Sequence, residues 1–229
     1  MLHRRSQACI ITFIGPVGVG KSTQIRLIKN YLKSKNIRVI KTFIKSNHAV
    51  TYVFSRSLKA LSCEKVSYPG GLNRIYPRRD IVRGLFPLWC FLDTLSIAIK
   101  FFLRVYIPFC LGFTPLIEEG LIMTLHTYSM TFPHFFNTEP KMLPFLPSLL
   151  GWIKSKNHIN VVLDARNDDL DRRRNNRNYR QNELPEYIFM QKKWIRRLNF
   201  GNTIFIDTTG EPALRVHRKI VAALENSTC

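Results

Sequence analysis

Eight consecutive residues near the amino terminus have the composition of a phosphate-binding loop. They read GPVGVGKS, which is the pattern GxxxxGKS, and comprise Gly15, Pro16, Val17, Gly18, Val19, Gly20, Lys21 and Ser22. The glycines let the backbone curl so that its N–H groups point at phosphate oxygens, and the helix that follows adds partial positive charge. The Lys21 ammonium can reach the β and γ phosphates, while the Ser22 hydroxyl can take a position around Mg²⁺. The motif therefore predicts an ATP and Mg²⁺ site made by these eight residues together with Thr23.

A second candidate site is an arginine-rich segment that follows an apolar run at residues 159–164. Acids at positions 168 and 169 can pair with the arginines four residues later, which is typical of a solvated helix. Several further arginines have no acidic partner at that spacing, and guanidinium groups at the end of a parallel strand are suited to clamp a phosphoryl group. Both interpretations stay open, and we favour the clamp. Its candidate residues are Arg173, Arg174, Arg177 and Arg180.

The patterning of apolar residues indicates the elements that position these groups. Residues 8–14 form a continuous apolar run ending at glycine, as a strand buried on both faces of a parallel sheet does. Residues 22–35 have helical periodicity with lysines between the apolar positions, and residues 37–44 are rich in β-formers. A strand, a loop, a helix and a strand in that order are typical of a doubly wound α/β fold.

The rest of the chain supplies further strands of the same sheet. They are predicted at residues 115–118, 159–164 and 203–207. Helices are expected at 49–61 and 88–105, with a loop over 63–83, while 124–147 remains unassigned. A charged helix–loop–helix precedes the last strand, and a helix over 212–224 closes the chain. We expect one domain over residues 1–229 with the three-layer P-loop NTPase fold, a five-stranded parallel sheet with helices on both faces.

The order of these motifs resembles the thymidylate kinase-like nucleoside monophosphate kinases, in particular their archaeal members. The matching features are GPVGVGKST followed by Gln24, LDAR before the arginine-rich segment, Glu186-Tyr187 on a helix, and IDTTGEP before the last helix. The match covers most of the chain, although residues 60–150 fit loosely. The resemblance implies a nucleotide kinase that uses ATP and Mg²⁺ to phosphorylate a nucleoside monophosphate or a related small acceptor. It also implies a LID-like segment at about 166–185 and an adenine-bordering loop at 208–212.

The sequence departs from that family at the end of the third strand. The family has an Asp-Arg pair there, whose acid helps to organise Mg²⁺ and whose arginine contacts the acceptor phosphate. This chain has Glu118 and Glu119 instead. Glu118 can still act on Mg²⁺ through water, together with Ser22, because Mg²⁺ keeps much of its water shell. Glu119 has the wrong sign to hold a phosphate, and both residues could simply be surface acids at a strand end.

Candidates for the acceptor side are less specific. Lys45, Asn47 and His48 follow the second strand, and the segment Arg78-Arg79-Asp80 lies in the expected loop. Residues of these types in loops are ordinarily solvated. Asp93 stands alone within an apolar helix, where a buried acid must be paired or functional. It could contact a sugar or a base, or pair within the core.

The composition bounds the partners and the compartment. Lys and Arg number 35 against 15 Asp and Glu, a formal net charge of +20, which implies polyanionic partners. A nucleic-acid-associated or regulatory P-loop protein without kinase activity is therefore the alternative function, and a homodimer is possible. Five cysteines without a CxxC pair indicate reduced thiols in a cytoplasmic protein. No membrane span is expected, because charges and prolines interrupt the apolar stretch 85–117.

Overall fold

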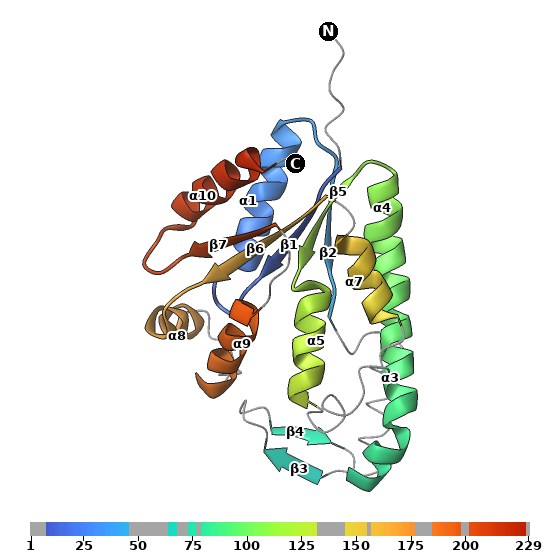
Figure 1. Ribbon diagram of the computed structural model, residues 1–229. Helices are drawn as coiled ribbons and strands as arrows, with labels where there is room; N and C mark the ends of the chain where they lie inside the picture. Colours follow the sequence, from blue (N-terminus) through green and yellow to red (C-terminus); the bar gives the residue numbers. More distant parts are fainter. Residues whose placement is uncertain are drawn as a thin grey trace.

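A parallel sheet forms the centre of the molecule (Figure 1). The computed structural model describes residues 8–45, 64–67, 73–76, 79–131, 145–154, 157–176, 185–197 and 202–227. Five strands lie in the order β2-β5-β1-β6-β7, and all neighbouring pairs are parallel. The strands are β1 (Ile10–Ile14), β2 (Val39–Phe43), β5 (Thr114–Glu118), β6 (His158–Asp164) and β7 (Thr203–Asp207). The expected fold class, with its five strands, is confirmed.

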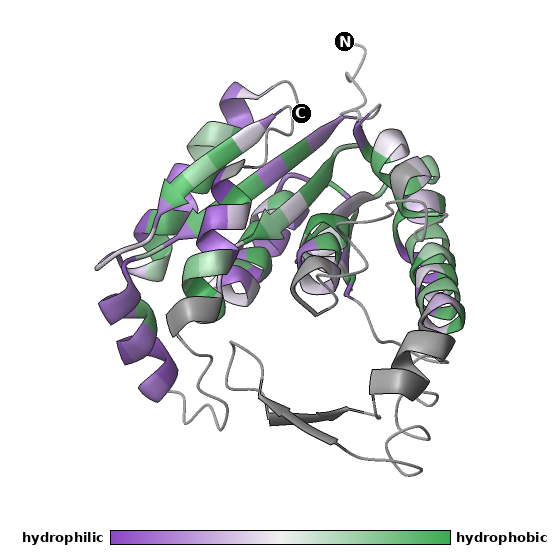
Figure 2. Ribbon diagram, turned by 60° about the horizontal axis from the view of Figure 1, so that its bottom comes forward, coloured by the Kyte–Doolittle hydropathy of each residue, from purple (hydrophilic) through white to green (hydrophobic). Residues whose placement is uncertain are grey.

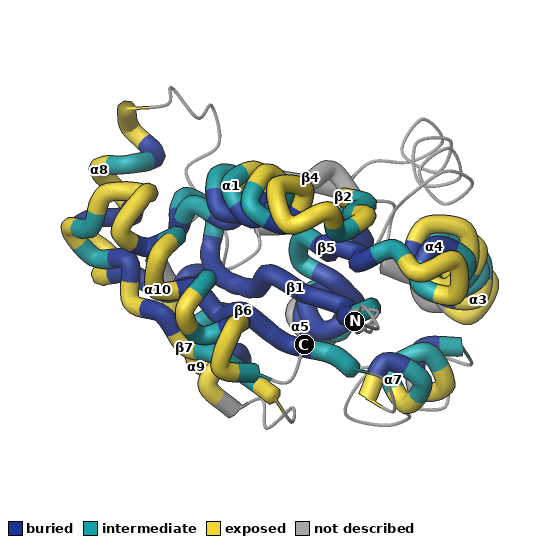
Figure 3. The backbone as a smooth tube through the Cα atoms, turned by 90° about the horizontal axis from the view of Figure 1, so that it is seen from above, coloured by how far each residue is buried: buried dark blue, intermediate teal, exposed yellow. Residues whose placement is uncertain are grey.

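The burial of each strand follows from its place in the sheet. Every residue of β1 is buried, and so are the five interior residues of β6, which explains why these residues are apolar except for Thr12 and Asn160. The edge strands β2 and β7 are only partly buried and carry polar residues such as Lys41 and Asp207. Figure 3 shows the same gradient from a buried centre to exposed edges.

Helices cover both faces of the sheet, as alternate side chains of β1 require. Ile11 and Phe13 belong to the core formed with α1 (Lys21–Ser34) and α10 (Ala213–Asn226). Ile10 belongs to the opposite core, which includes residues of α3 (Arg79–Phe101), α5 (Gly120–Thr131) and α7 (Leu146–Lys154). Ile14 packs near Ile195 of α9 (Pro185–Arg197) on that second side. The helix α8 (Asn167–Asn175), which follows β6, is strongly hydrophilic (Figure 2).

The segment between β2 and β5 in the chain differs from what the sequence predicted. Within residues 63–83, expected as a loop, β3 (Glu64–Ser67) pairs antiparallel with β4 (Asn73–Tyr76). The apolar helix begins earlier than expected, and α3 continues through a π-helical turn, η1 (Phe102–Tyr106), into α4 (Ile107–Cys110). The expected helix at 49–61 lies outside the described residues.

Two further expectations concern the membrane and the thiols. Within the described ranges, every helix is too short or too polar to cross a bilayer. Cys90 and Cys110 are free thiols. Cys9, however, is disulfide-bonded, so the expectation of five reduced cysteines is wrong for this residue.

Candidate nucleotide site

The segment from residue 15 to residue 20 connects β1 to α1, as the motif requires. Gly15 has φ 153° and its missing Cβ would lie 2.3 Å from the backbone oxygen of Leu163 on β6. Gly18 has φ 90°, and a Cβ there would lie 3.1 Å from Cγ of Arg174. A side chain is therefore excluded at Gly15 by main-chain contact and disfavoured at both positions by the backbone conformation. The loop is held tightly between the sheet and α8.

Lys21 is buried and its ammonium lies inside the loop. Its Nζ donates hydrogen bonds to the carbonyl oxygens of Gly15, at 2.6 Å, and Pro16, at 3.1 Å. The same Nζ lies 3.9 Å from Oε1 of Glu119. The lysine is thus satisfied by the loop itself and by one carboxylate, and it must exchange some of these contacts to bind phosphate oxygens.

Ser22 and Glu118 lie together beside the loop. The Ser22 hydroxyl, at the start of α1, donates to Oε1 of Glu118, at the end of β5. Oε2 of Glu118 lies 3.2 Å from Nζ of Lys41 on the edge strand β2. A hydroxyl next to a carboxylate provides the hard oxygen donors that Mg²⁺ prefers. The two residues expected to organise the metal are therefore neighbours in space.

Glu119 occupies an unusual backbone conformation next to that pair. It has φ 70°, in the left-handed region that residues with side chains seldom adopt, and its backbone N–H donates to the oxygen of Phe13 at 3.0 Å. Its carboxylate lies between Lys21 and Lys45, with Oε2 3.6 Å from Nζ of Lys45. The side chain is only 14% exposed. Glu119 therefore places negative charge within the site, next to the lysine of the loop.

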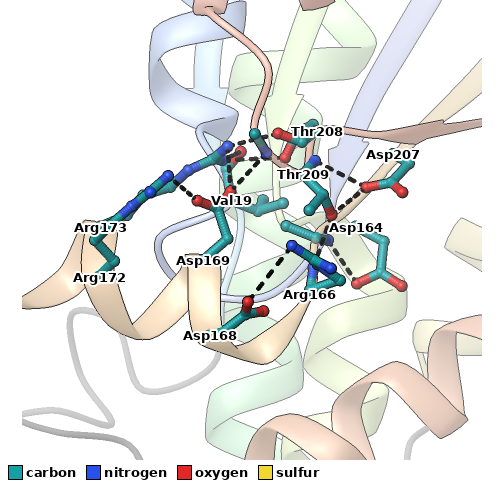
Figure 4. A network of polar contacts seen from close by, with 12 residues as sticks. Val19, Asp164, Arg166, Asp168, Asp169, Arg172, Arg173, Asp207, Thr208 and Thr209 are labelled. Carbon is teal, nitrogen blue, oxygen red and sulfur yellow. Dashed lines mark hydrogen bonds and ion pairs between the residues drawn. The ribbon is translucent and has the colours of Figure 1, made fainter.

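Arg173 connects α8 to the P-loop and to the loop after β7 (Figure 4). Its guanidinium pairs with Oδ2 of Asp169 at 2.7 Å and donates to both the hydroxyl and the carbonyl of Thr208, at 3.0 and 2.5 Å. A longer contact of 3.4 Å reaches the carbonyl oxygen of Val19 in the P-loop. One arginine thus joins three segments that surround the expected phosphate position.

Arg174 lies on the P-loop as well, but it is not without an acidic partner. Its guanidinium pairs with Asp171, three residues earlier, and its side chain is buried with Cγ close to Gly18. The pair has i,i+3 spacing, so the i,i+4 pattern of the sequence did not indicate it. The other two expected clamp residues, Arg177 and Arg180, lie outside the described residues.

Asp169 has a structural position in the candidate site that its sequence spacing did not indicate. Its spacing to Arg173 indicated an exposed ion pair, yet the side chain is almost fully buried. Burial acts to raise its pKa, but the Gly210 N–H and the guanidinium groups of Arg173 and Arg172 outweigh burial and hold the pKa below its usual range. Asp169 thereby fixes the position of Arg173, and only the tertiary contacts reveal this role.

Two further segments border the site. Asp207, at the end of β7, accepts hydrogen bonds from the hydroxyl and backbone N–H of Thr209, which lower its pKa. Thr209 Oγ1 in turn accepts from the backbone N–H of Arg166 at 2.9 Å. These bonds order the 208–212 loop that the family resemblance assigns to the adenine.

The acceptor-side candidates are only partly brought together. Lys45 reaches Glu119, as described above. Asp93 is fully buried on α3 and accepts a hydrogen bond from the hydroxyl of Tyr128 on α5, so it has a partner within the core. The other candidates fall on residues or side chains outside the description: Asn47, His48, Arg78, Arg79 and Asp80.

Known proteins were compared with this chain by sequence and by structure. No family model and no curated protein matches the sequence. Among solved structures, thymidylate kinase from Candida albicans is similar with a TM-score of 0.52 at 12% identity, over 96% of this chain and 92% of that one. Thymidylate kinase from Ehrlichia chaffeensis gives a TM-score of 0.55 at 15% identity, over 95% and 98%. The fold is thymidylate kinase-like. At these identities the similarity concerns the fold alone.

Proposed function

We propose that the protein is an ATP-dependent phosphotransferase, which moves the γ-phosphoryl group of ATP to a nucleoside monophosphate, thymidylate-like, or to a related small acceptor. The observation that carries the proposal is the position of Arg173. A P-loop alone indicates nucleotide binding, whereas an arginine that reaches the loop from a separate helix supplies charge where a phosphoryl group is transferred.

The residues of the site divide the work between binding and charge stabilisation. The loop residues from Gly15 to Thr23 would bind the phosphates of ATP, with Lys21 on the β and γ groups. Ser22 and Glu118 fit the chemistry of Mg²⁺ and would hold it, Glu118 through water. When bound, Mg²⁺ would neutralise charge on the phosphate oxygens. Because little covalent chemistry is required of the protein, positioning and electrostatics would account for the rate.

The segment 166–185 would act as the lid over the phosphates, with Arg173 and Arg174 from α8 and Arg177 and Arg180 beyond it. Arg173 is already held by Asp169 and Thr208, which supports a lid that has an anchored base. On this proposal, binding of ATP would slow amide hydrogen exchange more in residues 177–185 than in α8.

The acceptor is the open element of this proposal, because Glu119 stands where the family has an arginine. A screen with radiolabelled ATP and Mg²⁺ against nucleosides, nucleoside monophosphates and other hydroxyl compounds tests the function directly. Transfer of label to at least one small acceptor, lost in Lys21→Ala, is the expected result. ATP binding without transfer to any acceptor would contradict the kinase.

The alternative, a P-loop protein associated with nucleic acid, has one specific observation in its favour. The charge of +20 exceeds what one nucleotide site requires, and cations also gather on α9, away from the loop. This alternative excludes phosphotransfer to a small acceptor, so the acceptor screen separates it from the kinase, and the α9 surface can be tested separately.

A further inference from the structure

A cleft lies between one side of α9 and the start of α8, where the proposed lid segment begins. Its volume is about 520 Å³, within the range typical of small-ligand sites. The described residues that line it, which define the α9 cleft, are Asn167, Phe189, Lys192, Lys193 and Arg196. None of these belongs to the P-loop or to the Glu118-Glu119 pair.

The α9 residues of the cleft form one stripe along the helix. Positions 189, 192, 193 and 196 have the i, i+3, i+4, i+7 spacing that puts side chains on the same face. Phe189 is 62% exposed, so a large aromatic ring meets water at one end of the stripe. The cations occupy the rest of it.

The charges of the cleft are only partly balanced. Lys192 lies 3.1 Å and Arg196 3.3 Å from the Asp164 carboxylate, and Lys192 also donates to Oδ1 of Asn167 at 2.8 Å. Lys193 forms no ion pair with any described residue. Two of the three cations therefore share one carboxylate and the third has no acidic partner among the described residues, which leaves net positive charge within the cleft.

A helix end alone does not explain this arrangement. Lysines and arginines near a carboxyl terminus stabilise the helix dipole, which accounts for the cations of α9. It does not account for an exposed phenylalanine at the amino-terminal end of the same stripe, beside a cleft. A ring next to cations that track a groove is the combination that binds single-stranded nucleic acid, because phosphates contact the cations and bases stack on the ring.

We propose that the α9 cleft binds single-stranded nucleic acid, with a base stacked on Phe189 and backbone phosphates on Lys192, Lys193 and Arg196. This interaction goes beyond the proposed kinase function and gives the cations of the α9 cleft a role. Sequence specificity is not required, since every base has a face that can stack.

Fluorescence anisotropy with a labelled twelve-nucleotide oligothymidylate tests the proposal, with saturating ADP and Mg²⁺ present so that the P-loop is occupied. Phe189→Ala should weaken binding roughly 5- to 100-fold, as expected for loss of one stacked base. The matched control is Phe205→Ala, which removes a ring that is 58% exposed on β7, outside the cleft, and should leave the affinity unchanged. If both variants lose oligonucleotide affinity equally, or if neither loses any, the proposal is contradicted.

The charge contribution is tested by the salt dependence of the same binding. The double variant Lys193→Ala/Arg196→Ala should lower the slope of log affinity against log salt by about 1.4, because each phosphate contact on a single strand contributes about 0.7. The control Arg26→Ala/Lys33→Ala removes one exposed arginine and one exposed lysine from α1 and should keep the slope. If the two double variants behave alike, the binding is a general effect of net charge and the proposal is wrong.

Free nucleotides have the same chemistry and form a separate arm of the experiment. Thymidine monophosphate should compete with the oligonucleotide poorly, because it offers one phosphate instead of several. Competition at similar nucleotide concentrations would overturn the proposal and make the cleft a mononucleotide site. Since Phe189 lies outside the P-loop site, Phe189→Ala should keep its phosphotransferase activity and its melting temperature, so failure of this proposal and failure of the kinase remain distinguishable.

Discussion

The hydroxyl of Ser22 donates a hydrogen bond to the carboxylate of Glu118, although 96 positions separate the two residues in the sequence. The contact depends on the parallel pairing of β1 with β5, in which Phe13 lies opposite Glu118. Because the P-loop leaves β1 at that edge, the serine that begins α1 comes next to the acid that ends β5. A mutation at either residue therefore tests one shared site.

Glu118→Gln should reduce turnover about 100-fold or more while ATP affinity measured without metal changes little. The amide keeps the shape and can still accept the Ser22 hydrogen bond, but it loses the charge expected to steady Mg²⁺. Turnover over a range of Mg²⁺ concentrations, with calorimetry for ATP, measures both effects. Unchanged turnover would show that Glu118 is only a surface acid paired with Lys41.

Lys21→Ala should weaken ATP binding roughly 10- to 100-fold, as expected when a charged hydrogen-bond donor is removed. The fold should persist, because Lys21 does not belong to the apolar core and its partners include two loop carbonyls and the Glu119 carboxylate, all within the site. Calorimetry and thermal melting test the two statements. Lys33→Ala, on an exposed position of α1, is the control with the same change of charge. Equal ATP affinity in both variants would mean that the phosphates bind elsewhere.

Glu119→Arg should improve the binding of a phosphate-bearing acceptor by about 10-fold or more, because it converts repulsion into attraction beside Lys45. The native protein should correspondingly prefer an acceptor without a phosphate at that place, such as a nucleoside. Michaelis constants for thymidine and thymidine monophosphate, in both proteins, provide the comparison. Efficient phosphorylation of thymidine monophosphate by the native protein, with Glu119→Arg neutral or harmful, would mean that the acceptor phosphate is held by other residues.

His126 should make the free energy of unfolding depend on pH. It is fully buried on α5, and burial lowers its pKa from 6.5 to about 4. Since the unfolded chain binds the proton more readily, the stability that the neutral ring provides is complete above pH 6.5 and is lost as the pH falls toward 4. The loss amounts to about 1.4 kcal/mol per pH unit for one such histidine.

Urea unfolding at several pH values from 7 to 4.5 measures this dependence. His158, whose pKa burial also lowers to about 4, should contribute in the same direction. His126→Leu should therefore reduce the slope without abolishing it, and the double variant with His158→Gln should reduce it further. An unchanged slope in His126→Leu would show that the ring does not take up the proton on unfolding in this range.

The parallel sheet could be predicted because its strands carry strong local signals. A short apolar run such as residues 8–14 indicates a strand that is buried on both faces of a parallel sheet. The P-loop motif then predicts the order of strand, loop and helix. The β3–β4 pair could not be predicted, because EKVS and NRIY are short, polar and separated by glycine and proline. The helix α5 was not predicted either, since it begins at a glycine and its sequence, GLIMTLHTYSMT, does not separate apolar from polar residues clearly onto two faces.

The candidate site divides in the same way between local and tertiary signals. The loop residues follow from one contiguous motif. The placement of Glu118 near Ser22 was expected only from the family resemblance, and it depends on the pairing of β1 with β5. Asp169 is buried, and its ion pair with Arg173 is held in place, because α8 lies against the loop after β7. No residue spacing within α8 indicates that contact. Likewise, the pairing of Asp93 with Tyr128 requires α3 and α5 to be neighbours.

The contact between Gly15 and Leu163 restricts substitution at position 15 much more than at position 163. The atom that blocks a side chain at position 15 is a main-chain oxygen, which is present whatever residue occupies position 163. No second mutation on β6 can therefore make room for a first one at Gly15, and among descendants position 163 should drift among apolar residues while position 15 stays fixed. At Gly18 the nearest obstacle is the side chain of Arg174, which a shorter residue would remove, but the φ of 90° would still strain any residue with a side chain there. Position 18 should therefore also stay glycine, for a conformational reason that no change at position 174 relieves.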